Sequence, residues 1–225
     1  MARGGRMHFH LPKPLHGWRA FAGEVGIIVV GVLIALAAEQ VVEDWHWHQK
    51  VGIVRQSLMG ELANDRGRWE IDMASARCQL RDIDQLERWA QAGASTAPPK
   101  PGDSEPPGSL LLMHSANWTL ATGSETLDHF PIDEQLAFAA LYDGLAHRQV
   151  DIERASELSS RIEALIPLAT DAQARRDLRV ALGEVAMTIG SLRANDGYMT
   201  RHFDALGVKP DRRDFAADIG TPCKP

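Results

Sequence analysis

A run of fourteen residues without a charged side chain, VGIIVVGVLIALAA over 25–38, constrains this chain of 225 residues more than any other feature. As a helix the run extends only about 21 Å, which is short of the roughly 30 Å of hydrocarbon in a membrane. Extending it to residues 21–42 gives sufficient length and places Glu24 and Glu39 near the ends, where an acid reaches the headgroups. We therefore predict a transmembrane helix over residues 21–44.

The residues that flank this helix support the membrane interpretation and give it a direction. Trp18 precedes the apolar run, whereas Trp45 and Trp47 follow it, and such rings favour membrane interfaces. The arm of residues 1–20 contains four basic residues and no acid, and only two basic residues occur in the first stretch beyond the span. The positive-inside rule then predicts a cytoplasmic N-terminus and an external C-terminal part.

Two other interpretations of the apolar run remain open. It could be a buried helix of a soluble core. Against this interpretation, the helix is apolar on all of its sides, and basic and aromatic residues flank it. It could also be a cleaved signal peptide, because its length fits and Ala35-Leu36-Ala37 has the small-x-small form that signal peptidase recognises. Glu24 at the start of the run and the long segment before it argue against cleavage. We favour a retained single-pass anchor.

One side of the predicted transmembrane helix carries small residues. At helical period, Glu24, Gly31, Ala35 and Ala38 fall within a narrow stripe. Small residues let helix backbones approach closely, so this stripe is a candidate packing face for a second copy or another membrane protein. The alternative is that Gly and Ala are simply common in membrane helices.

Beyond the membrane the sequence has helical periodicity. Residues 45–91 carry apolar side chains at steps of three, four or seven, which predicts a stalk helix continuous with the anchor. Asp65 interrupts this stripe, and we expect it to be solvated. Residues 92–109 contain five Pro and three Gly, so we expect an exposed loop or linker there.

Residues 110–207 contain three further helical patterns, and residues 208–225 form a C-terminal tail. The patterns cover 115–130, the stretch from Pro131 to Pro167, and the stretch from Thr170 to Gly207. The short connection between the last two implies an antiparallel hairpin. Packing that hairpin and the short helix against the stalk predicts an all-α, up-and-down bundle.

The two cysteines, Cys78 on the predicted stalk and Cys223 near the C-terminus, bear on the compartment. An outward-facing domain in an oxidising compartment could join them in a disulfide. The alternative is two unpaired thiols, one in the core and one on the tail.

Motifs for chemistry are missing from the sequence. His46 and His48 cannot chelate one ion from a helix, because residues two apart point to nearly opposite sides. No HExxH, CxxC, GxSxG or phosphate-loop pattern occurs, so we expect no enzyme, no catalytic or metal-binding residue and no cofactor. The net charge of -6 also disfavours nucleic acid as a partner, because phosphate binding needs clustered cations.

The N-terminal part of the chain resembles a family. HLPKPLHGWR over 10–19, followed by GEVGIIVVGVLIAL over 23–36, is similar to the start of a set of uncharacterised bacterial single-pass membrane proteins. A weaker similarity is the spacing of Trp118, Gly123 and Tyr142. The resemblance implies an inner-membrane anchor and a helical periplasmic domain, and it implies no catalytic residue.

Two functions fit these predictions. The first is a membrane-anchored interaction or scaffold protein, whose partners are the lipid bilayer and either a second copy or another envelope protein. The alternative is a periplasmic ligand-binding or sensor-like domain without enzymatic activity.

Overall fold

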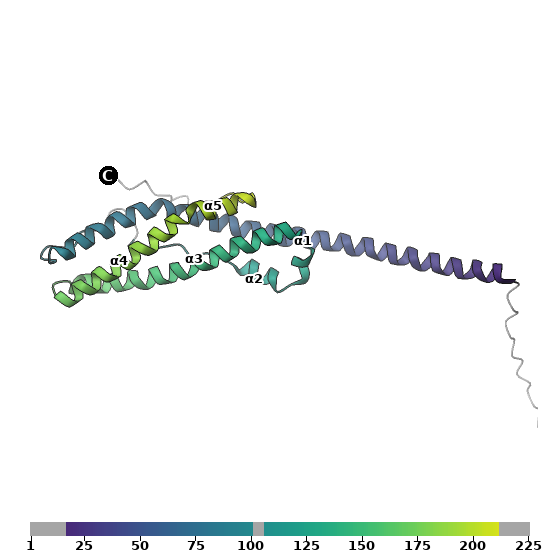
Figure 1. Cartoon of the computed structure of the whole chain (residues 1–225), viewed down its shortest axis with the longest axis horizontal. Coiled ribbons are helices and arrows are strands. Elements are labelled where there is room, and N and C mark those ends of the chain that lie inside the picture. The colour runs from purple at the N-terminus through teal and green to yellow at the C-terminus, as the bar shows by residue number, and fades with distance from the viewer. Residues whose placement is uncertain (1–16, 101–105, 212–225) are drawn as a thin grey trace, which may run out of the picture. The chain divides into compact units, whose positions relative to one another are not determined.

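The computed structural model describes residues 17–100 and 106–211, and every regular element within these ranges is a helix (Figure 1). The predicted all-α class is therefore confirmed. The elements are α1 (Gly17–Gln91), α2 (Ala116–Thr122), η1 (Glu125–His129), α3 (Ile132–Leu165), η2 (Ile166–Leu168), α4 (Ala172–Ala194) and α5 (Asp196–Ala205). The chain divides into two compact units, residues 1–49 and residues 50–225, which we describe separately.

The first unit contains the beginning of α1. Its apolar side chains are exposed, as at Ile27, where 76% of the residue surface is free. Within α1, an 18-residue window has the composition of a membrane span, and none of it is buried by the rest of the protein. This part of α1 is therefore long and apolar enough to cross a membrane.

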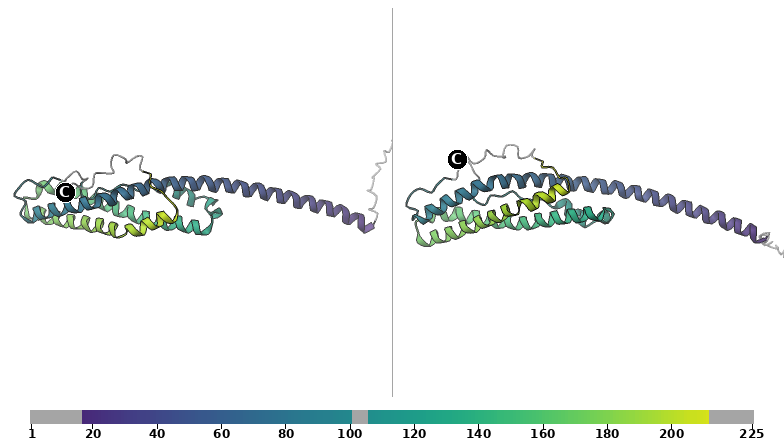
Figure 2. Two further views of the ribbon diagram at one scale, coloured as in Figure 1. Left: turned by 90° about the horizontal axis from the view of Figure 1, so that it is seen from above. Right: turned by 45° about the horizontal axis from the view of Figure 1, so that its top comes forward.

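The second unit is a helical bundle formed by α1 from residue 50 onward, α3, α4 and α5. η2 joins α3 to α4, and these two helices pack along each other (Figure 2), which confirms the predicted antiparallel hairpin. Asp171 begins α4 because its carboxylate accepts hydrogen bonds from the backbone N–H groups of Gln173 and Ala174. An ion pair between Arg55 and Glu134 links α1 to the start of α3.

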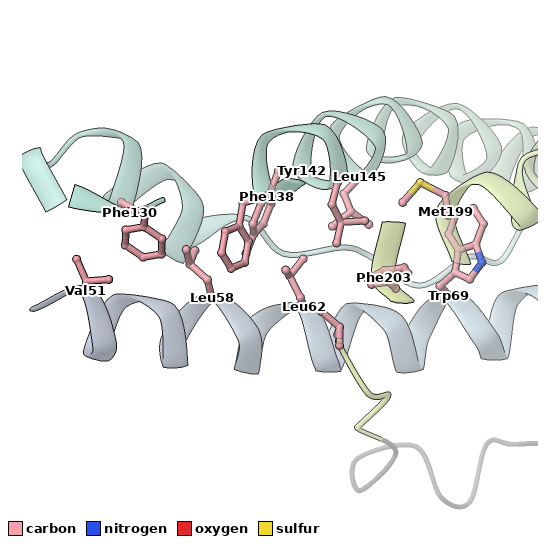
Figure 3. Packing of buried hydrophobic residues seen from close by; sticks show 13 residues of the cluster. Val51, Leu58, Leu62, Trp69, Phe130, Phe138, Tyr142, Leu145, Met199 and Phe203 are labelled. Atoms are coloured by element: carbon pink, nitrogen blue, oxygen red, sulfur yellow. The ribbon is translucent and has the colours of Figure 1, made fainter. Parts of the chain in front are cut away.

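Two apolar clusters fill the bundle. The first cluster, shown in Figure 3, contains Val51, Leu58, Leu62, Trp69, Ala121, Phe130, Phe138, Leu141, Tyr142, Leu145, Met199, Phe203 and Val208. The second cluster contains Ala76, Ile83, Leu86, Ala90, Ala94, Leu158, Ile162, Ala169, Leu178, Ala181, Leu182, Val185 and Ile189. Along α1, the first cluster ends at Trp69 and the second begins at Ala76. Between these two residues α1 buries a charged side chain, Asp72.

Two of the predicted helices are each divided in two. The pattern over 115–130 forms α2 and η1, because α2 ends at Gly123 and the Ser124 hydroxyl accepts a hydrogen bond from Thr126 N–H to begin η1. The last predicted helix is broken at Asn195, which separates α4 from α5.

Candidate functional site

Buried polar side chains occupy one face of α1 at heptad spacing. Asp65, Asp72 and Gln79 follow each other at intervals of seven residues, on the same side of the helix as Val51 and Leu58. Asp65 and Gln79 are 0% exposed and Asp72 is 2% exposed. The expectation that Asp65 is solvated is therefore wrong. Its position in the apolar stripe is a buried position, and a polar partner compensates for the burial.

That partner is the segment of residues 106–117, which we call the strap. The strap begins at the end of the Pro/Gly-rich loop and continues into the first turn of α2. The three buried side chains of α1 each accept a hydrogen bond from a strap N–H: Gly108 N to Gln79 Oε1 at 3.0 Å, Leu111 N to Asp72 Oδ2 at 3.2 Å, and His114 N to Asp65 Oδ1 at 3.0 Å. The loop of residues 92–109 is thus not exposed throughout, because Pro107 and Gly108 are buried.

The spacing of these contacts has a geometric reason. Seven residues of α-helix rise about 10.5 Å. Three residues of extended chain cover about 10 Å. The strap and α1 run in opposite directions, so an acceptor every seven residues on α1 meets an N–H every third residue on the strap. Buried N–H groups need acceptors, and without a neighbouring strand the strap obtains them from helix side chains.

Side chains of the bundle bind four further backbone groups of the strap. These are Gln79 Nε2 to Ser109 O at 2.9 Å, Arg68 Nη1 to Leu112 O at 2.7 Å, Met113 N to Gln149 Oε1 at 3.3 Å, and Asn117 N to Glu61 Oε2 at 2.9 Å. Most of these partners lie on α1, and Gln149 lies on α3. The strap is therefore held chiefly through its backbone.

A buried ion pair lies beside the strap. Arg148 of α3 is 2% exposed and donates from Nη2 to Asp72. Its guanidinium carbon lies 4.3 Å from the centroid of the Trp69 ring, which favours a cation above its face. The Trp69 indole N–H in turn donates to Asp196 at 2.7 Å, at the start of α5. No described residue accepts a hydrogen bond from Arg148 Nε or Nη1.

Burial dominates the electrostatics of this pair. It raises the pKa of Asp72 to about 6, although Arg148 and the Leu111 N–H both oppose the shift. Burial also lowers the pKa of Arg148, against the attraction of Asp72. Both charges are thus kept in an environment that disfavours them, and each depends on the other.

A second polar group surrounds Asp65. Its carboxylate lies 3.3 Å from Nδ1 of His114, in addition to the backbone contact. Burial raises the pKa of Asp65 to about 6, because lost hydration outweighs the N–H and the ring of His114, while Glu61 adds repulsion. Glu61 also accepts a hydrogen bond from the Tyr142 hydroxyl at 2.8 Å. Burial is the largest cause that raises the pKa of Tyr142, and the hydrogen bond to Glu61 is the next.

Two glycines allow backbone segments to approach closely. Gly108 has a φ of +87°, and a Cβ there would lie 2.7 Å from the carbonyl oxygen of Ala155. On α1, a Cβ at Gly67 would lie 2.2 Å from the carbonyl oxygen of Asp211. The segment that follows α5 therefore crosses α1 where only glycine leaves room.

The residues singled out from the sequence have the following environments in the structure. Glu24, Gly31, Ala35 and Ala38 are exposed on the first part of α1, as are Trp18 and Trp45, whereas Trp47 is half-buried. Trp118 stacks on Tyr142 with ring centroids 4.8 Å apart. Cys78 is buried on α1. Cys223 lies outside the described residues, so its pairing with Cys78 stays a prediction.

The polar site was missed because each side chain was judged by itself. The heptad spacing of Asp65, Asp72 and Gln79 within an apolar stripe was the available signal. Within residues 17–100 and 106–211, no group of three or more His, Cys, Asp or Glu side chains is placed to hold a metal ion. Comparisons with protein-family models, curated proteins and solved structures give no match for this chain.

Proposed function

We propose that this protein is a single-pass anchor in a bacterial inner membrane, with a periplasmic helical bundle that has an interaction or scaffold role. The observation that carries the proposal is the apolar window of α1, which the rest of the protein leaves unburied. A helix of this composition in a soluble core would be covered by other elements. The excess of basic residues before the window supports the proposed orientation.

The character of the bundle supports a structural or interaction role over catalysis. The buried polar side chains at heptad spacing on α1 are already bonded to the chain itself, since Asp65, Asp72 and Gln79 all bind strap N–H groups. These groups position a segment of backbone. The resemblance of the N-terminal part to uncharacterised bacterial membrane proteins agrees with the proposed location.

Membrane insertion is tested by extraction at alkaline pH and by protease treatment of spheroplasts. We expect the wild-type chain to stay in the membrane pellet and the bundle to be cleaved from outside. Arginine at the centre of a span costs about 2.5–3.5 kcal/mol on insertion scales, so the double variant Val30→Arg/Leu33→Arg should move to the soluble fraction. Ile53→Arg changes an exposed apolar residue of the bundle and should remain in the pellet.

Two results would contradict this proposal. A soluble mature protein that begins after Ala37 would show that the apolar run is a cleaved signal peptide. A bundle that resists protease in intact spheroplasts but is cleaved after lysis would reverse the orientation.

The interaction role is tested by crosslinking in cells followed by mass spectrometry. We expect crosslinks to a second copy or to one envelope protein. Gly31→Leu/Ala35→Leu should lower their yield severalfold, because larger side chains keep helix backbones apart. Gly26→Leu is the matched control, since Gly26 lies on the opposite side of the helix and, like Gly31, has open space around it. Equal yields from all three proteins would remove the packing face from the proposal.

A further inference from the structure

One side of α4 is apolar but takes no part in the core of the bundle. Val180, Gly183, Met187 and Gly190 recur at steps of three and four residues, which places them in one stripe along the helix. Val180 is 55% exposed and Met187 is 70% exposed. The residues of α4 that fill the second apolar cluster lie on the opposite side of the helix. We call the exposed side the outer stripe.

No contact within the described chain requires the two glycines of the outer stripe. A Cβ at Gly183 or at Gly190 would meet nothing within 4 Å. On α3, by contrast, a Cβ at Gly144 would lie 2.8 Å from the sulfur of Met199. Glycine is less favourable than alanine inside a helix, and its use there is to let another group approach the backbone closely. Gly183 and Gly190 thus leave room for a helix of another chain beside α4.

The charges beside the outer stripe indicate which chain fits. When the stripe occupies the a and d positions of a heptad, Arg179 takes a g position and Glu184 takes the following e position. In a parallel pair of helices, a g side chain lies beside the next e side chain of the partner. A second copy of α4 in the same direction would therefore pair Arg179 with Glu184 twice, once on each side of a two-fold axis. An antiparallel copy would instead bring Glu184 beside Glu184 and Arg179 beside Arg193, which are like charges.

The contact of Glu184 within the chain leaves it free to accept a second donor. Arg154 of α3 donates from Nη2 to Oε2 of Glu184 at 2.6 Å, and the Glu184 side chain stays 31% exposed. A carboxylate has about four lone pairs and can accept from two guanidinium groups. Val150, one turn before Arg154 on α3, is 65% exposed and widens the apolar surface on this side of the hairpin.

We propose that two copies of this chain associate through the outer stripe, with their α4 helices side by side and parallel. The apolar stripe and its glycines supply the close contact, and the two pairs of Arg179 with Glu184 select the direction and the partner. This inference rests on the interaction role proposed above and names a second copy as the partner. A single helical stripe is a small interface, and anchors in a common membrane would raise the effective concentration of the two copies.

Disulfide crosslinking of the full chain in membranes tests the pairing. Equivalent a positions face each other in parallel helices, so Met187→Cys should form a linked dimer when an oxidant is added. The wild type, which has Cys78 and Cys223, measures the background. Ser156→Cys is the matched control, because Ser156 is also exposed but lies on another side of the hairpin. We expect the control to give severalfold less dimer.

Charge variants in the Met187→Cys chain test the direction of the helices. Arg179→Glu or Glu184→Arg turns two attractive surface pairs into two repulsive ones, so each alone should lower the dimer yield about fivefold. When the two variants are coexpressed with different tags, a mixed dimer has both attractive pairs again. Mixed dimers should therefore exceed the statistical level relative to the two homodimers. An antiparallel pair would not show this preference.

A glycine variant tests the close contact. Gly183→Leu/Gly190→Leu in the Met187→Cys chain should lower the dimer yield severalfold, because larger side chains keep the two helices apart. The thermal midpoint of the bundle should not fall, since a Cβ at either position has open space and leucine is the better helix former. Loss of the dimer with an unchanged midpoint separates lost pairing from lost folding.

Three outcomes would overturn the pairing. They are equal dimer yields from Met187→Cys and Ser156→Cys, mixed dimers at the statistical level, and a yield that the leucine variant does not change. If the wild type is still crosslinked to an envelope protein in any of these cases, the interaction role stands and only the pairing through α4 fails. If the wild type has no crosslinked partner of any kind, the interaction role fails with it.

Discussion

Replacing Asp72 by Ala should lower the free energy of unfolding by about 3–5 kcal/mol, the usual cost of breaking a buried ion pair from one side. Arg148 would keep its charge inside the bundle. Its Nη2 would lose the acceptor Asp72, while no described residue accepts a hydrogen bond from its Nε or Nη1. The Leu111 N–H would also lose its acceptor. Chemical denaturation in detergent measures the loss as a lower midpoint with an unchanged slope.

Two variants show whether the cost arises from the unpaired charge. In Asp72→Leu/Arg148→Met both charges are absent, and we expect it to recover most of the lost stability, because apolar pairs often replace buried ion pairs without penalty. Recovery should be incomplete by about 1–3 kcal/mol, since Leu111 N–H still lacks its partner. Asp84→Ala breaks an exposed pair with Arg88 on the same helix and should cost less than about 1 kcal/mol. A double variant as unstable as Asp72→Ala would contradict this explanation.

Preventing the predicted Cys78–Cys223 disulfide should lower the free energy of unfolding by a similar amount. A bridge that closes so long a loop restricts the unfolded chain and adds about 4–5 kcal/mol in the chain-entropy model. Cys223→Ala should therefore lower the free energy of unfolding by about that amount, and reduction of the wild-type protein should give the same loss. Denaturation with and without reductant measures both.

Alkylation followed by mass spectrometry provides the control for the disulfide. Unreduced wild-type protein should show no alkylated cysteine, and reduced protein should show two. Two modified cysteines in the unreduced protein would contradict the pairing. Equal stability of the wild type and Cys223→Ala would do so as well.

The predictions that depended on periodicity agree with the structure. Apolar residues at helical spacing gave the all-α class and the α3–α4 hairpin, because the period of a helix repeats within a few residues and needs no distant information. Pro131 and Pro167 marked the limits of α3 closely, since proline interrupts a helix by local sterics. Breaks without proline, at Gly123 and Asn195, were missed.

Predictions that depended on a distant partner were wrong or absent. Asp65 was expected in solvent because a charged side chain is rarely buried alone. It is buried because His114, 49 residues later, supplies an N–H and a ring nitrogen. Pro107 and Gly108 were placed in an exposed loop because residues 92–109 are rich in Pro and Gly. Their burial results from packing on α1 and α3, which composition does not reveal.

The sequence by itself determined the helical class and the presence of an apolar segment long enough to cross a membrane, because both are properties of consecutive side chains. Only the tertiary structure decided which polar residues are buried and what they bind. Acceptors at heptad spacing on α1 meet the N–H groups of every third strap residue, and that match joins parts of the chain 29 to 49 residues apart. The position of the strap therefore depends on long-range register, whereas the helices depend on local periodicity.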